Sequence, residues 1–125
     1  MERPNILVVD DEAEVCSCLK SYFERRNFVV STSGKGREGL SLMRSSKYDI
    51  VLLDLSLPDL NGDLVLEELR KNDKETKVII VTGNDDVKMK DRLTKLGIED
   101  YCTKPLTPKK LLEVVQKALG LPLAE

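Results

Sequence analysis

The chain has 125 residues, 41% of them hydrophobic and 34% charged, which is enough to bury one core and to solvate its surface. Lysine and arginine number 20 and aspartate and glutamate 22, so the net charge of −2 provides no attraction toward nucleic acid or anionic membranes. We therefore expect one compact domain over residues 1–125, with no direct contact to nucleic acid.

The sequence also indicates a cytoplasmic protein. No apolar stretch is long enough to span a bilayer, and residues 1–4 are too short and polar to form a signal peptide. The cysteines Cys16, Cys18 and Cys102 are odd in number, and the first two are expected on different faces of one helix. This pattern predicts small, apolar-like, reduced side chains, and neither a disulfide framework nor a metal cluster.

Histidine is absent from the sequence. Its absence removes the usual general base, the histidine-dependent nucleophilic triads and most imidazole metal sites. Any chemistry in this chain must therefore depend on carboxylates, hydroxyls and lysine.

Short apolar runs alternate with helical patterns along the chain. In chain order, the predicted strands cover residues 6–9, 28–30, 50–53, 78–81 and 101–103. The second and fifth runs are weaker, which is typical of strands nearer a sheet edge. The apolar positions that predict helices lie within residues 15–23, 40–43, 64–69, 89–96 and 111–119. This alternation predicts an α/β fold, with a parallel sheet covered by helices on both faces.

Helix boundaries carry separate signals. Thr107 followed by Pro108 is typical of an N-cap and a first helical residue, and Gly97 and Gly120 suit helix C-termini. The third helix is expected to open at residues 61–62. These signals place the helix ends where the periodic apolar pattern stops.

Polar side chains follow four of the five predicted strands. Asp10 and Asp11 follow the first strand, Asp54 the third, Thr82 the fourth and Lys104 the fifth. All carboxyl ends of a parallel sheet lie along one edge, where open α/β sheets bind their ligands. The topology therefore predicts that these residues, far apart in sequence, converge.

Each of these residues also has an ordinary structural explanation. An aspartate after the first strand could cap the first helix, Thr82 with residues 84–86 could form a turn and a cap, and Lys104 could be one more surface lysine. Asp54 fits such an explanation less well, because residues 55–58 separate it from the next helix. The set as a whole favours a functional site.

The charges of this set indicate a metal ion and phosphoryl chemistry. Asp10, Asp11 and Asp54 repel one another when held close together, and Lys104 cancels only one of their charges. A divalent cation would supply the missing positive charge, and oxygen ligands suit Mg²⁺ or Mn²⁺ and not zinc. A carboxylate such as Asp54 can attack phosphorus to give an acyl phosphate, while metal, lysine and hydroxyl neutralise the phosphoryl oxygens.

Four short motifs, in this order and at these strand ends, are specific to one family. They are residues 8–12 (VVDDE), Asp54 followed by residues 55–58 (LSLP) and Gly62, residues 81–83 (VTG), and residues 101–105 (YCTKP). Over essentially its whole length the chain resembles a receiver domain of bacterial two-component response regulators.

The resemblance implies a flavodoxin-like three-layer sandwich, with five parallel strands in the order 2-1-3-4-5 and five helices. It implies that residues 1–125 form a single receiver domain without an effector domain. Asp54 would take its phosphoryl group from a histidine kinase or a histidine phosphotransfer protein. Such a domain is not an enzyme that turns over a substrate, because it catalyses only its own phosphorylation and dephosphorylation.

The resemblance also assigns roles in metal binding. Mg²⁺, or Mn²⁺ in its place, would be bound by Asp11, Asp54 and the backbone carbonyl of Ser56, with Asp10 acting largely through water. Lys104 would pair with the phosphoryl group and with Asp54, and its peptide bond to Pro105 would be cis.

The implied switch consists of Thr82 and Tyr101. Thr82 would move to hydrogen-bond the phosphoryl group, and Tyr101 would turn inward behind it, which shifts the population between two packings. The signal would leave through the face formed by the fourth helix, the fifth strand and the fifth helix, toward an unknown effector domain or protein, or through a dimer. A half-buried aromatic at a sheet edge is the structural alternative for Tyr101.

The chain departs from the family pattern at two positions. Asn61 stands where an aspartate is common, and Ile98 follows Gly97 where alanine is usual; neither touches the phosphorylation chemistry.

Two other functions compete with the receiver domain. A phosphatase of the haloacid dehalogenase type needs a second aspartate two residues after the nucleophile, where this chain has Ser56, and a cap domain. A pseudo-receiver that never carries phosphate would not need the complete acidic set.

Overall fold

The computed structural model describes residues 3–83 and 85–123, which form five strands and five helices in strict alternation. In chain order these are β1 (Asn5–Val9), α1 (Ala13–Glu24), β2 (Val29–Ser33), α2 (Gly36–Ser45), β3 (Ile50–Leu53), α3 (Gly62–Arg70), β4 (Lys77–Thr82), α4 (Val87–Leu96), β5 (Asp100–Thr103) and α5 (Pro108–Leu119). In these two described ranges no helix combines the length and apolar character that crossing a bilayer requires.

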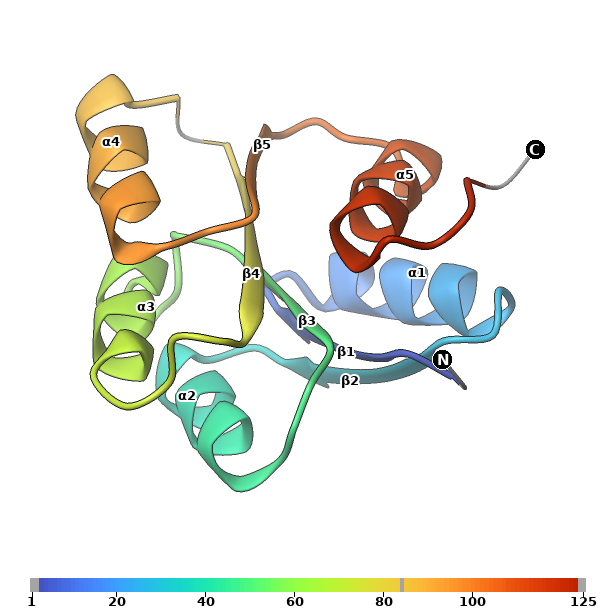
Figure 1. The fold of residues 1–125 in the computed structure, drawn as a ribbon, viewed down its shortest axis with the longest axis horizontal. Coiled ribbons are helices and arrows are strands. Elements are labelled where there is room, and N and C mark those ends of the chain that lie inside the picture. The colour runs from blue at the N-terminus through green and yellow to red at the C-terminus, as the bar shows by residue number, and fades with distance from the viewer. Residues whose placement is uncertain (1–2, 84, 124–125) are drawn as a thin grey trace.

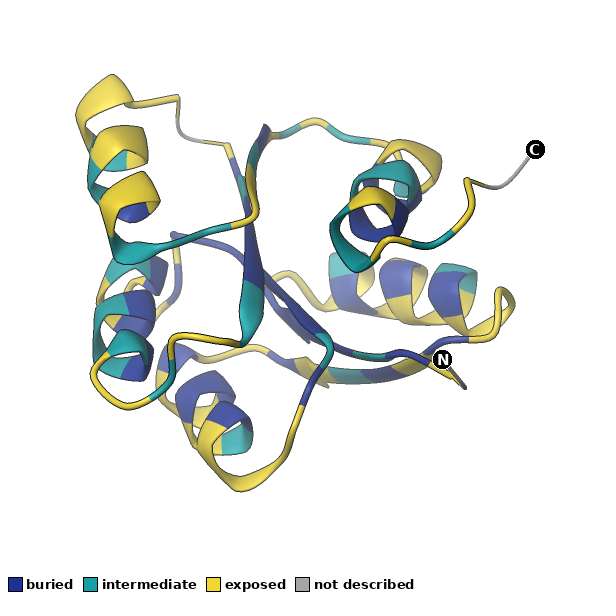
Figure 2. Cartoon of the chain, in the orientation of Figure 1, coloured by how far each residue is buried: buried dark blue, intermediate teal, exposed yellow. Residues whose placement is uncertain are grey.

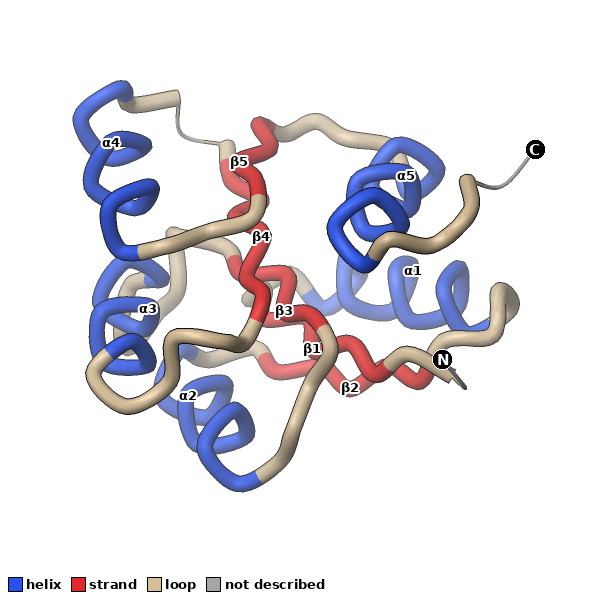
Figure 3. Tube along the Cα trace, in the orientation of Figure 1, coloured by secondary structure: helices blue, strands red, loops and turns tan. Residues whose placement is uncertain are grey.

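The strands form one parallel sheet in the order β2-β1-β3-β4-β5. Figure 1 shows α1 and α5 on one face of this sheet and α2, α3 and α4 on the other. The strands run as one continuous band between the two helical layers (Figure 3). The predicted three-layer α/β sandwich, its strand order and its parallel pairing are therefore confirmed.

Alternate residues along each central strand supply two separate cores. On β1, Leu7 and Val9 pack under α2, α3 and α4, whereas Ile6 and Val8 pack under α1 and α5. All of β1 beyond its first residue and all of β3 are buried (Figure 2). In the sequence such strands are continuous apolar runs, because helices cover both faces of a parallel sheet. Ile98 is half-buried against the first of these cores.

The second strand differs from its prediction. β2 covers Val29–Ser33, so it starts after Phe28 and extends through three polar residues beyond the predicted end. As an edge strand it pairs with β1, and its burial is irregular: Val30 and Ser33 are buried, whereas the other three residues are exposed or half-buried. Because the polar half carries no apolar run, its strand character was not readable from hydrophobicity.

The predicted helix boundaries are confirmed. The Thr107 side chain accepts a hydrogen bond from the Lys110 backbone N–H, and Pro108 opens α5. Gly97 and Gly120 end α4 and α5 with φ of +106° and +68°, values that favour glycine. Asn61 is the N-cap residue of α3.

The cysteines follow their prediction in part. Cys16 is buried and Cys18 is exposed, so the two do lie on different faces of α1, and Cys102 is buried as well. All three are free thiols. The expectation of small, apolar-like side chains suits the buried Cys16 and Cys102, whereas Cys18 faces water on the helix.

Candidate functional site

Four strands deliver the predicted site residues to one edge of the sheet. Asp10 directly follows β1, Asp54 directly follows β3, Thr82 is the last residue of β4, and Lys104 directly follows β5. Register is held across the strand ends, because the Asp54 backbone N–H donates to the Val9 carbonyl at 3.0 Å. The Lys104 N–H donates to the Thr82 carbonyl at 2.7 Å in the same way. The hydrogen-bonded ends of β1, β3, β4 and β5 therefore fix the backbone of these residues.

The acidic side chains lie in different environments. Asp10 is 4% exposed and Asp54 is 6% exposed, whereas Asp11 is exposed to solvent. One carboxylate oxygen of each lies within 4.8 Å of the others. Three negative charges at this spacing, two of them in a protein interior, repel strongly unless positive charge is brought in.

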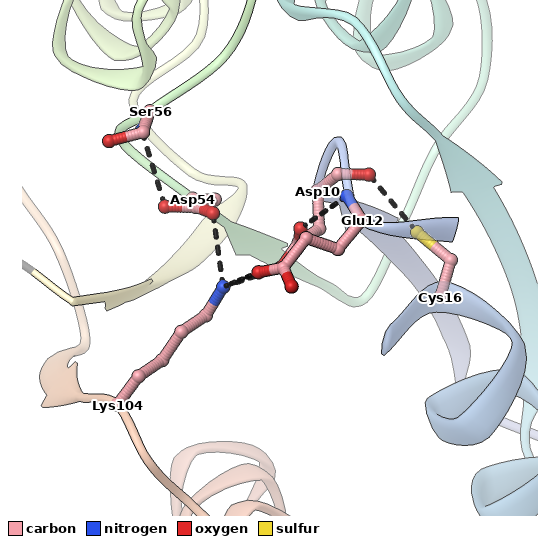
Figure 4. A network of polar contacts seen from close by, with 6 residues as sticks. All are labelled: Asp10, Glu12, Cys16, Asp54, Ser56 and Lys104. Carbon is pink, nitrogen blue, oxygen red and sulfur yellow. Dashed lines mark hydrogen bonds and ion pairs between the residues drawn. The ribbon is translucent and has the colours of Figure 1, made fainter. Parts of the chain in front are cut away.

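Lys104 supplies part of that charge. Its Nζ lies 2.9 Å from Asp10 Oδ2, 3.1 Å from Asp54 Oδ2 and 3.5 Å from Glu12 Oε1 (Figure 4). Partial burial favours the neutral amine, but the hydrogen bonds to Asp10 and Asp54 outweigh it and raise the pKa of Lys104. The lysine is therefore a permanent cation, and its bond to Pro105 is cis.

Backbone groups fix the second oxygen of each buried carboxylate. Asp54 Oδ1 accepts a hydrogen bond from the Ser56 N–H at 3.2 Å, and Asp10 Oδ1 accepts one from the Glu12 N–H at 2.9 Å. The Cys16 thiol donates to the Asp10 carbonyl at 3.2 Å (Figure 4). Each carboxylate thus has one oxygen on the backbone and the other on Lys104. Asp10 organises the turn before α1, whose N-cap residue is Glu12.

The surroundings of Asp54 disfavour its ionised form. Burial raises the pKa of Asp54 above its ordinary value, and the neighbouring Asp10 charge raises it further. Hydrogen bonds from Lys104 and Ser56 lower it again but only in part. A carboxylate of raised pKa is a better nucleophile than an ordinary one. A further cation beside it would stabilise its ionised form.

The donor set fits a hard divalent cation. Asp10, Asp11 and Asp54 present carboxylate oxygens at one point, with Lys104 as the only ammonium hydrogen-bonded to this trio among the described residues. Three negative charges and one positive charge leave the site short of positive charge. Oxygen donors with this shortfall match Mg²⁺ or Mn²⁺, and the exposure of Asp11 leaves a path from solvent.

The two predicted switch residues lie on neighbouring strands behind the carboxylates. Thr82 is fully buried at the end of β4. Tyr101 is half-buried on β5, paired in register with Ile80, and packs against the core under α2, α3 and α4. Lys90 Nζ of α4 lies 5.7 Å from the Tyr101 ring centroid. Burial and then the charge of Asp85 raise the pKa of this phenol.

Some participants were not predicted from the sequence. Glu12 contacts Lys104, and Asp59 contacts the start of α2, although neither was assigned a contact. In the sequence, residues 84–86 suit a turn and a helix cap. Asp86 does cap α4, since its side chain accepts from the Lys88 and Met89 N–H groups, while residue 84 lies outside the described residues.

Residues 6–116 match the sequence profile of the family described as the response regulator receiver domain. The chain belongs to this family. The match covers all five strands except the first residue of β1, and most of α5. The resemblance that the four motifs indicate is therefore confirmed.

Curated relatives of this receiver domain are longer than the chain. The uncharacterized transcriptional regulatory protein YkoG of Bacillus subtilis is 38% identical over 119 residues, which are 95% of this chain and 52% of the relative. The cell cycle response regulator CtrA of Brucella ovis is 34% identical over 107 residues, which are 86% of this chain and 46% of the relative. The receiver domain thus spans about half the length of these proteins.

Solved structures of the same family superpose closely. The CheY-like response regulator receiver domain protein of Methanospirillum hungatei has a TM-score of 0.91 at 29% identity, covering 94% of both chains. The signal receiver domain of a Luxo repressor protein from Vibrio parahaemolyticus has a TM-score of 0.88 at 31% identity, covering 94% of this chain and 91% of the other. The flavodoxin-like, CheY-like fold is therefore confirmed.

Proposed function

We propose that this receiver domain carries a signal by accepting a phosphoryl group on Asp54 from a phosphohistidine of a histidine kinase or phosphotransfer protein. The observation that carries the proposal is the shared contact of Lys104 Nζ with Asp10 Oδ2 and Asp54 Oδ2 at 2.9 and 3.1 Å, beside Asp11. The nucleophile Asp54, the ammonium group of Lys104 and two further carboxylates thereby meet at one point, where a divalent cation would balance the remaining negative charge.

The chain's own groups account for the transfer. A carboxylate oxygen of Asp54 forms the new bond to phosphorus, the phosphorus–nitrogen bond of the donor breaks, and its electron pair returns to the donor imidazole. Lys104 neutralises charge on the phosphoryl oxygens. Asp11, Asp54 and the Ser56 carbonyl would hold Mg²⁺, or Mn²⁺, with Asp10 acting through water. Such a cation would supply further charge neutralisation at the same oxygens.

The phosphoryl group is a timed signal and not a reaction product. The acyl phosphate loses its group to water within the same site, so the domain catalyses only its own phosphorylation and dephosphorylation. Ser56 stands where a haloacid dehalogenase phosphatase has its second aspartate, which speaks against turnover of other substrates. The complete set of Asp10, Asp11, Asp54 and Lys104 speaks against a pseudo-receiver.

We also propose Thr82 and Tyr101 as the switch. The Thr82 hydroxyl gains a phosphoryl oxygen as partner in only one of two packings, and Tyr101 on the neighbouring strand follows it inward. The half-buried position of Tyr101 beside α4 supports this role, because the ring has both core and solvent within reach. The signal would leave through the α4, β5 and α5 face.

The output of this signal is a further proposal. The relatives named above are transcriptional and cell cycle regulators about twice as long as this chain, which supports an effector domain or partner protein acting on the α4, β5 and α5 face. A dimer through that face is one form of the active state. With a kinase as phosphoryl donor, we place the action of the domain in the cytoplasm.

The test uses acetyl phosphate as the phosphoryl donor. With Mg²⁺ we expect one phosphate adduct in the intact mass, and with EDTA none. Amide shifts of Thr82 and Tyr101, recorded on the same samples, are expected to move with the adduct. An adduct that forms equally well in EDTA contradicts the metal site, and unchanged shifts in the phosphorylated chain contradict the switch.

A further inference from the structure

An aspartate in the loop after the acidic site caps a helix that is distant in sequence. Asp59 Oδ1 accepts a hydrogen bond from the Gly36 N–H at 2.7 Å, and Asp59 Oδ2 accepts one from the Arg37 N–H at 3.1 Å. These are the first two residues of α2. The helix's own N-cap residue, Lys35, makes no side-chain cap hydrogen bond in the described structure. Asp59 therefore replaces a local cap across 23 positions.

Close backbone contacts hold the same loop on both sides. A Cβ on Gly36 would lie 2.1 Å from the Leu60 carbonyl oxygen, and a Cβ on Gly62 would lie 2.2 Å from the Asp54 carbonyl oxygen. The Gly62 N–H also donates to the Leu55 carbonyl at 2.9 Å. The segment between Asp54 and α3 is thus pressed against the start of α2 at one point and against its own beginning at another.

The start of α2 is also tied to the other half of the acidic site. The Ser33 carbonyl, just before α2, accepts a hydrogen bond from the Asp10 N–H at 2.9 Å. The Ser33 hydroxyl donates to Glu38 Oε1 at 2.7 Å, and its oxygen accepts from the Lys35 N–H at 3.3 Å. One short connection, residues 33–37, therefore contacts both the backbone of Asp10 and the loop that begins at Asp54.

We propose that Asp59 is a positioning residue for the divalent cation, because it couples the loop of Asp54 and Ser56 to the start of α2 and so to Asp10. The inference rests on the proposed function. Carboxylates that repel one another move apart when their loops are free to relax, whereas Mg²⁺ demands near-octahedral oxygen ligands at fixed short distances. A cap that holds the loops in register lowers the cost of assembling the ligands.

The ionisation of Asp59 agrees with this role. Loss of solvation works against its charge, but hydrogen bonds from the Arg37 and Gly36 backbone N–H groups keep the pKa of Asp59 below its ordinary value. The cap is therefore a carboxylate at neutral pH. A negative charge at a helix N-terminus is also stabilised by the helix dipole.

The chain offers a matched control for substitution. Asp73 likewise holds a turn, since its Oδ1 accepts from the Glu75 and Thr76 N–H groups at 2.9 Å each. It lies between α3 and β4, at the amino ends of the strands, whereas the acidic site lies at their carboxyl ends. Asp73→Ala therefore removes a comparable turn-forming carboxylate without touching residues 33–37 or the loop after Asp54.

The experiment compares the Mg²⁺ dissociation constant of the unaltered chain, Asp59→Ala, Asp59→Asn and Asp73→Ala by isothermal titration calorimetry. We expect Asp59→Ala to bind Mg²⁺ several-fold more weakly, which is less than the roughly 10-fold loss on removing a direct hydrogen-bond partner of a metal ligand, because Asp59 acts through the Gly36 and Arg37 backbone. Asp59→Asn keeps one acceptor oxygen, so its Mg²⁺ dissociation constant is expected to lie between those of the unaltered chain and Asp59→Ala. Asp73→Ala is expected to bind as the unaltered chain does.

Amide hydrogen exchange at Gly36 and Arg37 provides a second readout. We expect faster exchange at both amides in Asp59→Ala, a smaller change in Asp59→Asn and none in Asp73→Ala, with thermal unfolding still cooperative in every variant. Equal Mg²⁺ affinity in Asp59→Ala and the unaltered chain, or an equal loss in Asp73→Ala, would overturn the inference while leaving the proposed function standing. An unaltered chain that binds no Mg²⁺ would overturn both.

Discussion

Replacement of Asp54 by asparagine is expected to abolish the phosphate adduct that the unaltered chain forms with acetyl phosphate and Mg²⁺. The amide keeps the shape of the side chain, and its oxygen can still accept the Ser56 N–H. It carries no negative charge and is a poor nucleophile toward phosphorus. Intact mass spectrometry of the treated variant is the measurement, with the mass of the untreated variant as the expected result.

Asp49→Asn is the matched control for this substitution. Asp49 is a half-buried aspartate that accepts the Asn5 N–H at 2.6 Å, at the opposite edge of the sheet. It is expected to form the adduct as the unaltered chain does. A Mg²⁺-dependent adduct that survives in Asp54→Asn contradicts the assignment of the phosphoacceptor.

Lys104→Met is expected to change two properties in opposite directions. Removing the ammonium takes away a fixed cation from the phosphoryl oxygens, so the rate of adduct formation at saturating Mg²⁺ should fall about 100-fold, as when one charge-stabilising donor is lost. The same change leaves Asp10 and Asp54 without their shared cation, which lies 2.9 and 3.1 Å away. Mg²⁺ should therefore bind several-fold more tightly.

The measurements for Lys104→Met are a time course of intact mass and a calorimetric Mg²⁺ titration. Lys77→Met is the control, because Lys77 is also half-buried and its Nζ donates to the Ala118 carbonyl at 2.7 Å, away from the site. Weaker Mg²⁺ binding in Lys104→Met would show that the lysine organises the carboxylates and does not compete with the metal for them.

The sequence predicted the location of the candidate site, because that location follows from the topology of the sheet. Once the five apolar runs are taken as strands of a parallel sheet, the positions of Asp10, Asp54, Thr82 and Lys104 at strand ends follow from chain order alone. No side-chain geometry is needed for that step. The charge argument for a divalent cation requires only that the carboxylates meet, and they lie within 4.8 Å of one another.

Contacts that depend on the path of a loop were not predictable in this way. Asp59 caps α2 because the loop after Asp54 folds back over Gly36, and no periodic pattern in the sequence encodes that path. Glu12 reaches Lys104 across 92 positions for a similar reason. The polar end of β2 was missed because strand pairing there depends on backbone hydrogen bonds to β1 and not on apolar side chains.

The most direct measurement of the central claim is the position of the acyl phosphate. After phosphorylation with Mg²⁺, borohydride reduces an aspartyl phosphate to homoserine, and peptide mass spectrometry locates the change. The account predicts homoserine at position 54 in the treated chain and at no other aspartate. Homoserine at Asp10 or Asp11, or an adduct that yields no homoserine at all, would contradict it.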